Sequence, residues 1–153
     1  NLRKLYFRKD RVGIPKCKIN KKIIKQDMAW CDDPKHKKYN KEIKIYNKNL
    51  KENLHRKDHK YDYIISISHN EKKTPGKGSA VFIHLTDDYK PTAGCIALKK
   101  KDFEILLKLI DKKTKIKIYI MCNKYGVFCE FIDFLCNFSK TRSSGNHLII
   151  YTR

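Results

Sequence analysis

Residues 78–98 read GSAVFIHLTDDYKPTAGCIAL and carry the pattern on which the interpretation of the whole chain depends. Residues 80–85 are mostly apolar on both faces, which predicts a strand in the interior of a sheet, and this strand includes His84. Eleven residues after His84 comes Cys95, directly behind three small residues at 92–94. A cysteine with a nearby base is the minimum requirement for a thiolate nucleophile.

Spacing alone leaves two interpretations of this pair open. If the two strands lie side by side, His84 can take the thiol proton of Cys95, and the amides near Gly94 can form an oxyanion hole. Alternatively, Cys95 is an ordinary core residue, because cysteine is among the most buried residue types. His84 is then a strand histidine whose hydrogen bonds are satisfied.

The flanking sequence predicts a mainly β fold with a few helices, of the α+β class. Alternating or short apolar runs predict strands at residues 2–8, 61–68, 95–98, 115–121 and 147–152. Helical spacing predicts one helix that Asp102 caps, with Phe103, Leu106, Leu107 and Ile110 on its apolar face, and another near residues 128–135, followed by a turn at 143–146. Residues 12–58 are polar and irregular, which predicts a long loop-like region with an ordered cluster at 29–40.

Length and composition predict a domain with room for a hydrophobic core. The chain has 153 residues, of which 41% are hydrophobic and 11% aromatic, and this excludes wholesale disorder. It contains no apolar run of about 18 residues that would span a bilayer. Its first residues lack the apolar core of a signal peptide.

The formal net charge of +20, from 36 Lys and Arg against 16 Asp and Glu, favours polyanionic partners. These include nucleic acid, an anionic membrane surface and an acidic cell-wall polymer. The lysines are spread along the whole chain, however, as in plain compositional bias. Because aromatic–basic RNA-binding motifs are absent, nucleic acid is not the expected partner.

The six cysteines, at positions 17, 31, 95, 122, 129 and 136, do not indicate a metal site. None forms a CxxC pair or a Cys/His set with zinc spacing. Their even number permits disulfides, but Cys95 has to stay free if it is a nucleophile. Cysteine usage therefore leaves the compartment open.

Several upstream blocks carry a resemblance to a known family. They are Trp30-Cys31-Asp32-Asp33-Pro34 with Tyr39-Asn40, then Glu52-Asn53-Leu54 with Arg56 and Asp58, then Tyr61-Asp62 and His69-Asn70. In this order, and together with residues 78–98, they resemble the L,D-transpeptidase (YkuD-type) catalytic domain, in particular a bacterial branch with WCDDP and TAGCIAL blocks. The resemblance covers about residues 2–121 and implies a mixed β-sheet or sandwich fold with no metal and no organic cofactor.

Carried over residue by residue, the resemblance implies that Cys95 is the nucleophile and His84 the general base. It also implies that a backbone carbonyl orients the histidine and that the backbone at Gly94 contributes to the oxyanion hole. The candidate substrate-binding residues are Thr92, His69, Asn70, Asp33 and Trp30. For Asp33 the structural alternative is a turn before Pro34, and for Trp30 it is packing.

Two positions depart from the family's best-known pattern. Ala93 stands where those members have a second histidine, and Ala97 stands where they have an arginine that contacts the substrate carboxylate. Lys90, Lys99 and Arg56 are the candidates to replace that arginine. The strands with which the branch usually begins are also missing, and we hypothesise that the strand at 147–152 lies beside residues 2–8 in their place.

The resemblance implies a peptidoglycan-modifying enzyme, with a catalytic domain at 1–121 and an extension at 122–153 packed on it. Cys95 would attack a diaminopimelate carbonyl of a stem peptide, and an amine or water would then release the acyl group. The expected location is the cell envelope or periplasm, with stem peptides as partners and an acidic cell-wall polymer as a further one. The alternatives are a hydrolytic carboxypeptidase or endopeptidase, and a non-catalytic basic module that binds peptidoglycan or nucleic acid.

Overall fold

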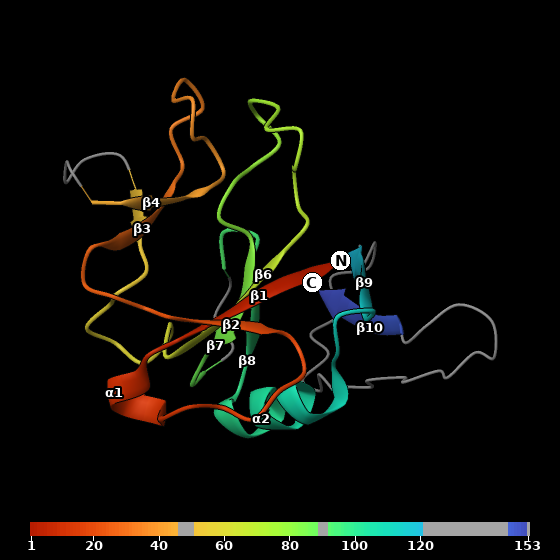
Figure 1. Cartoon of the computed structure of the whole chain (residues 1–153). Coiled ribbons are helices and arrows are strands. Elements are labelled where there is room, and N and C mark those ends of the chain that lie inside the picture. The colour runs from red at the N-terminus through yellow and green to blue at the C-terminus, as the bar shows by residue number, and fades with distance from the viewer. Residues whose placement is uncertain (46–50, 89–91, 121–146, 153) are drawn as a thin grey trace. The chain divides into compact units, whose positions relative to one another are not determined.

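The computed structural model describes residues 1–45, 51–88, 92–120 and 147–152 (Figure 1). The helix and turn predicted at 128–135 and 143–146 lie outside the described residues. The chain divides into two compact units, Leu2–Lys112 and a second one made of Asn1 and Lys113–Arg153. Each is described by itself, and the division into a domain at 1–121 and an extension at 122–153 stays a prediction.

The larger unit contains a mixed five-stranded sheet in the order β2-β1-β6-β7-β8. Its strands are β1 (Leu2–Phe7), β2 (Asn20–Ile23), β6 (Tyr63–Ile67), β7 (Phe82–Leu85) and β8 (Ile96–Leu98). β1 pairs parallel with β2 and antiparallel with β6, and β7 pairs antiparallel with β6 and parallel with β8. β7 therefore lies inside the sheet with all four residues buried, which confirms the interior strand expected there.

Successive side chains of a strand point to opposite faces, so the register decides which residues share a face. One row of paired residues across the sheet is Tyr6, Ile64, His84 and Ala97. The adjacent row is Leu5, Ile65, Ile83 and Ile96, and it faces the other way. Because both rows contain buried apolar residues, β6 has two apolar faces rather than the one that alternation predicted.

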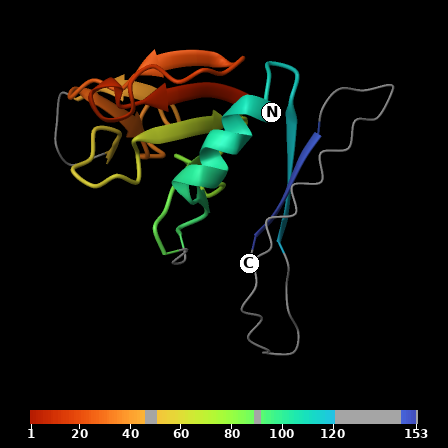
Figure 2. The same ribbon diagram turned by 90° about the horizontal axis from the view of Figure 1, so that it is seen from below.

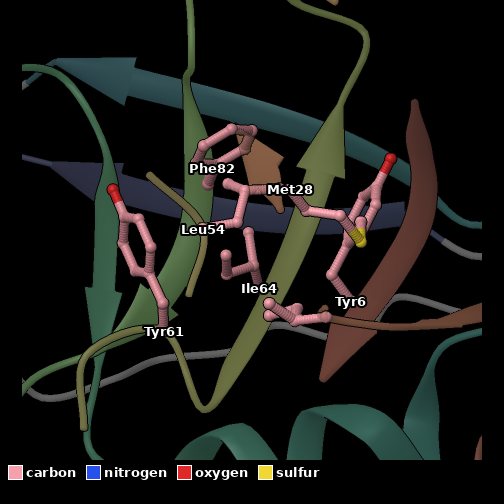
Figure 3. Close-up of a cluster of buried hydrophobic side chains, with 7 residues drawn as sticks. Tyr6, Met28, Leu54, Tyr61, Ile64 and Phe82 are labelled. Carbon is pink, nitrogen blue, oxygen red and sulfur yellow. The ribbon is translucent and has the colours of Figure 1, made fainter. Parts of the chain in front are cut away.

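A second, three-stranded sheet contributes to the core on the face that carries His84. It consists of β4 (Glu42–Lys44), β3 (Met28–Cys31) and β5 (Lys51–Asn53), in that order. A core cluster of buried side chains contains residues from both sheets and from the segments beside them (Figure 3). Its members are Tyr6, Ile24, Met28, Leu54, Tyr61, Ile64 and Phe82. The prediction of a long irregular region at 12–58 is thus wrong for β2–β5, because these short strands lie in a largely polar stretch and most of them are not continuous apolar runs.

Helix α2 (Lys100–Leu109) lies against the opposite face of the five-stranded sheet (Figure 2). It buries Phe103, Leu106 and Leu107, as its spacing predicts, and the ring of Phe103 stacks on Tyr63 at 5.3 Å. The predicted cap is wrong, because the helix begins after Lys99 and Asp102 lies within its first turn. Neither α2 nor the one-turn α1 (Lys9–Val12), the two helices of the described part, is long and apolar enough to cross a bilayer.

The smaller unit contains two parallel strands among its described residues, β9 (Lys115–Ile120) and β10 (His147–Thr152). Both strands were predicted. The hypothesis that residues 147–152 lie beside residues 2–8 is wrong, because β10 pairs with β9 in its own sheet. β1 has no free edge for it, since β2 and β6 occupy the two sides of β1.

The core cluster makes a stability prediction. Ile64 is fully buried, so Ile64→Ala removes packed methyl groups and leaves a cavity, and we expect it to lower the free energy of unfolding by about 2–5 kcal/mol. The matched control is Ile105→Ala on α2, where the side chain is 46% exposed and the change should stay within about 0.5 kcal/mol. Urea denaturation of both variants measures the difference, and equal losses would contradict the assigned core.

Candidate active site

Cys95 lies between an exposed turn and the buried start of β8. The turn consists of residues 92–94, and the Thr92 hydroxyl closes it by donating a hydrogen bond to the Cys95 carbonyl at 2.6 Å. Gly94 has φ +108°, a backbone conformation that other residues rarely adopt, although a side chain there would meet nothing within 4 Å. Glycine is therefore required by the backbone conformation, while the space beside the turn is open.

The Cys95 sulfur is enclosed by the backbone that leads into β7. Its Sγ donates a hydrogen bond to the Ala80 carbonyl at 3.3 Å, and a backbone hydrogen bond from Phe82 also acts on it. The side chain packs against the core cluster. Burial raises the pKa of the Cys95 thiol, and the Glu52 carboxylate adds to that rise, whereas the Phe82 hydrogen bond opposes it. At neutral pH Cys95 is therefore a thiol.

His84 is buried on β7 and its tautomer follows from its backbone contact. Nδ1 lies 2.8 Å from the Leu85 carbonyl, which can only accept, so Nδ1 carries the proton and Nε2 has a free lone pair. Burial lowers the pKa of His84. The imidazole is thus neutral at pH 7 and able to take a proton at Nε2.

The pairing of β7 with β8 brings these two residues to one face of the sheet. His84 is the partner of Ala97, and Cys95 lies one residue before β8. The Cys95 side chain packs against the core cluster, and Phe82 of that cluster shares a face of β7 with His84. Strand spacing and rise place the Cα atoms of His84 and Cys95 about 8 Å apart. Because Sγ donates to Ala80, the Cys95 side chain has to rotate before its proton can reach His84.

Tyr61, Glu52 and Arg56 form a polar group beside His84. The Tyr61 ring contacts His84 edge-on at 5.4 Å, and its hydroxyl bonds the Glu52 carboxylate. The Arg56 guanidinium lies 5.0 Å from the Tyr61 ring and pairs with Asp58 at 2.6 Å and Glu52 at 3.2 Å. Arg56, a candidate to replace the family arginine, therefore already binds two carboxylates; Lys90 lies outside the described residues, and Lys99 precedes α2.

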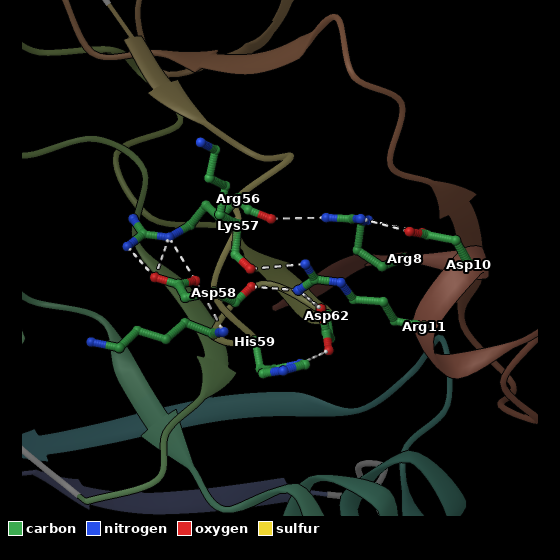
Figure 4. Close-up of polar contacts among 9 residues, drawn as sticks. Arg8, Asp10, Arg11, Arg56, Lys57, Asp58, His59 and Asp62 are labelled. Carbon is green, nitrogen blue, oxygen red and sulfur yellow. Dashed lines mark hydrogen bonds and ion pairs between the residues drawn. The ribbon is translucent and has the colours of Figure 1, made fainter.

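Two arginines hold the loop that carries this group (Figure 4). Arg8 donates to the Arg56 carbonyl at 2.9 Å. Arg11 donates to the carbonyls of Lys57 and Asp58, at 2.8 and 2.7 Å, and pairs with the buried Asp62 at 3.0 Å. These bonds satisfy carbonyls that no strand partner reaches, so the two side chains fix the backbone of the loop.

Three of the predicted substrate-binding residues make contacts within their own loops. Asp33 accepts a hydrogen bond from the Lys35 N–H at 2.9 Å, which is the predicted alternative of a turn. His69 Nε2 donates to the Lys77 carbonyl at 2.7 Å. The Asn70 side chain bonds the carbonyls of Thr74 and Gly78 and the Thr74 N–H, and so closes the connection between β6 and β7. A substrate-binding role for these side chains stays a prediction.

Trp30 and Asn40 link these loops to the site. The Trp30 ring packs edge-on against Phe82 at 5.1 Å, and its Nε1–H donates to Asn40 Oδ1 at 2.9 Å, so packing accounts for its contacts. Asn40 is a residue for which sequence reasoning assigned no role. The only sequence signal for a role of Asn40 was its place in the Tyr39-Asn40 block. The sequence did not show its partners, because they lie up to 40 residues away along the chain.

A small cavity of about 140 Å³ lies past the end of β7 and does not reach the sulfur. It is lined by His59, Lys60, Asp62, Leu85, Thr86, Asp87 and Lys100. Among the described residues no group of three His, Cys, Asp or Glu side chains is placed to hold a metal ion.

The fold and the site define a mainly β protein with a neutral imidazole on one strand and a thiol just before the parallel strand beside it. The model of the L,D-transpeptidase catalytic domain family (YkuD) matches residues 16–118, which is more than half of the chain. The chain belongs to this family, as its sequence blocks predicted. No curated protein and no solved structure matches the chain significantly.

The arginine contacts make a prediction about the loop at 56–62. Arg11→Ala removes three hydrogen bonds and leaves the buried Asp62 carboxylate with fewer partners, so we expect the free energy of unfolding to fall by about 1–3 kcal/mol. The control is Arg3→Ala, which breaks an exposed pair with Glu71 and should cost less than about 0.5 kcal/mol. Denaturant titration of both variants tests this, and a neutral Arg11→Ala would contradict it.

Proposed function

We propose that the protein is a peptidoglycan-modifying cysteine acyltransferase, an L,D-transpeptidase that acts on the diaminopimelate residue of stem peptides. The observation that carries the proposal is the hydrogen bond from His84 Nδ1 to the Leu85 carbonyl, which leaves Nε2 free on the face that also carries Cys95. Family membership supplies the substrate class. The site is proposed to work without a metal or an organic cofactor.

In the first half-reaction Cys95 attacks the amide carbonyl at the L-centre of diaminopimelate. His84 Nε2 takes the thiol proton as the sulfur–carbon bond forms. The carbonyl oxygen becomes an oxyanion, and the proposed donors that stabilise it are the backbone N–H groups at Gly94 and Cys95. The open space beside Gly94 supports this assignment. His84 then protonates the departing amine, which leaves a thioester on Cys95.

In the second half-reaction an amine of another stem peptide attacks the thioester. His84 takes a proton from that amine and returns it to the sulfur, which restores the thiol and forms the cross-link. If water attacks instead, the same steps give hydrolysis. The exposed turn at residues 92–94 admits either acceptor, so the products distinguish a transpeptidase from a carboxypeptidase or endopeptidase.

The resting pair is neutral rather than an ion pair. Burial raises the pKa of Cys95 and lowers that of His84, and both shifts disfavour the charged forms. Proton transfer and attack on the carbonyl therefore occur together, by general-base catalysis. The proposed location is the cell envelope, where stem peptides occur. The high positive charge is compatible with an additional acidic cell-wall polymer.

The first prediction from the proposed function concerns the nucleophile. Cys95→Ala should abolish product formation from defined muropeptides, and His84→Ala should reduce the rate about 10²–10⁴-fold. Mass spectrometry of the products gives both results. A carbapenem should add its mass to the wild type at Cys95 and not to Cys95→Ala. Cys17→Ala serves as the control, because Cys17 lies outside the site, and an unmodified wild type would overturn the proposal.

The second prediction concerns pH. His84 has to be neutral to act as a base, so the rate falls as pH drops through the pKa of His84, with a midpoint below the ordinary histidine value of about 6.5. The Lys60 cation contributes to the lowered pKa of His84, so Lys60→Gln should move the midpoint upward. Lys57→Gln is the matched control and should leave it in place. A downward movement for Lys60→Gln in the measured pH–rate profile would contradict the assignment.

A further inference from the structure

We propose that Asn40 is a positioning residue for Cys95 and acts through the backbone of Ala80. The inference rests on the proposed function only in taking Cys95 as the reacting group. Asn40 belongs to the loop between β3 and β4, whereas Ala80 lies 40 residues further along the chain, just before β7. The side chain of Asn40 is the contact that joins the two segments.

All the hydrogen-bonding positions of the Asn40 amide are used. Oδ1 accepts from Trp30 Nε1 at 2.9 Å and from the Ala80 N–H at 3.2 Å. Nδ2 donates to the carbonyls of His69 and Asn70, at 2.8 and 3.1 Å. The two donors at Oδ1 and the two carbonyls at Nδ2 fix the orientation of the amide, because a flipped amide would oppose like groups. The backbone N–H of Asn40 adds a bond to the Cys31 carbonyl at 2.8 Å.

Ala80 needs such a contact because its backbone is in the left-handed region. Its φ is +53°, which is uncommon for a residue with a side chain and persists only where the surroundings hold it. The strand predicted from residue 80 begins at Phe82 for this reason. In this conformation the Ala80 N–H reaches Asn40 while its carbonyl accepts from Cys95 Sγ at 3.3 Å.

The backbone of residues 80–82 thus touches the sulfur from two sides. The Ala80 carbonyl accepts a hydrogen bond from the thiol, and the Phe82 hydrogen bond is available to the thiolate. The Glu52 carboxylate also acts on Cys95, and the side-chain hydrogen bonds of Asn40 to residues 30, 69, 70 and 80 do not include it. Removing Asn40 should therefore loosen the enclosure of the sulfur and leave this carboxylate in place.

The test is the pH dependence of alkylation by iodoacetamide, followed at each cysteine by peptide mass spectrometry. For Asn40→Ala we expect the Cys95 midpoint to fall toward the ordinary thiol value of about 8.5, because the sulfur gains solvent. At pH 7.5 the alkylation rate of Cys95 should rise at least about fivefold. Product formation should fall in the same variant. Buried Cys31 should stay protected and Cys17 unchanged, which reports an intact fold.

The variant Asn40→Asp distinguishes the contacts made by Oδ1 from those made by Nδ2. It keeps an oxygen for the Trp30 and Ala80 N–H groups and loses the donors to residues 69 and 70, so the Cys95 midpoint should not fall. A fall in both variants would assign the effect to the 69–70 loop and overturn the proposal, as would an unchanged Cys95 in Asn40→Ala. If Asn40→Ala exposes Cys31, Asn40→Gly replaces it, because glycine also removes the amide and adopts the positive φ of residue 40 without strain. An unchanged Cys95 midpoint in that variant overturns the proposal.

The remaining control is Asn53→Ala, which removes a side-chain bond to the His55 N–H on the other side of the second sheet and should change nothing at Cys95. Alkylation requires no turnover of stem peptides. An inert enzyme with the expected alkylation pattern would therefore sink the proposed function and leave the role of Asn40 standing.

Discussion

The parallel pairing of β7 with β8 is the contact on which the candidate site depends. It places His84 opposite Ala97 and sets Cys95 two residues further back on the same face. The same pairing buries His84 between strands, and this burial keeps the imidazole neutral. The position, tautomer and protonation state of His84 thus follow from its place on β7 beside β8.

This arrangement is supported by polar side chains that hydrogen-bond the backbone carbonyls and N–H groups of irregular loops. Arg8 and Arg11 bind the carbonyls of the loop at 56–58, and Asn40 binds the loops at 69–70 and at Ala80. Such groups are costly to leave unpaired when they are partly buried, so each contact restricts the chain to one path. Asn40, Arg56 and residues 69–70, which take part in these contacts, belong to the upstream blocks on which the resemblance is based.

Sequence reasoning located the elements whose signals are local. The strands at β1, β6 and β7, the apolar face of α2, and the pair His84 and Cys95 were all visible as patterns or motifs. The short strands β2–β5 were not, because they lie in a largely polar stretch and, unlike β7 and β8, most of them are not continuous apolar runs. The contact of Asn40 with Ala80 was also out of reach, since it depends on a left-handed alanine that no local preference favours. For the same reason the start of β7 was placed two residues too early.

The raised pKa of Cys95 also affects the chemical durability of the protein. Peroxides and disulfides react with thiolates, and a cysteine with a lowered pKa is oxidised first in oxidising surroundings. On the proposed mechanism, the Cys95 thiol becomes nucleophilic only as His84 takes its proton, so it would present little thiolate between turnovers. Burial that disfavours the Cys95 thiolate therefore also disfavours the formation of sulfenic acid at this residue.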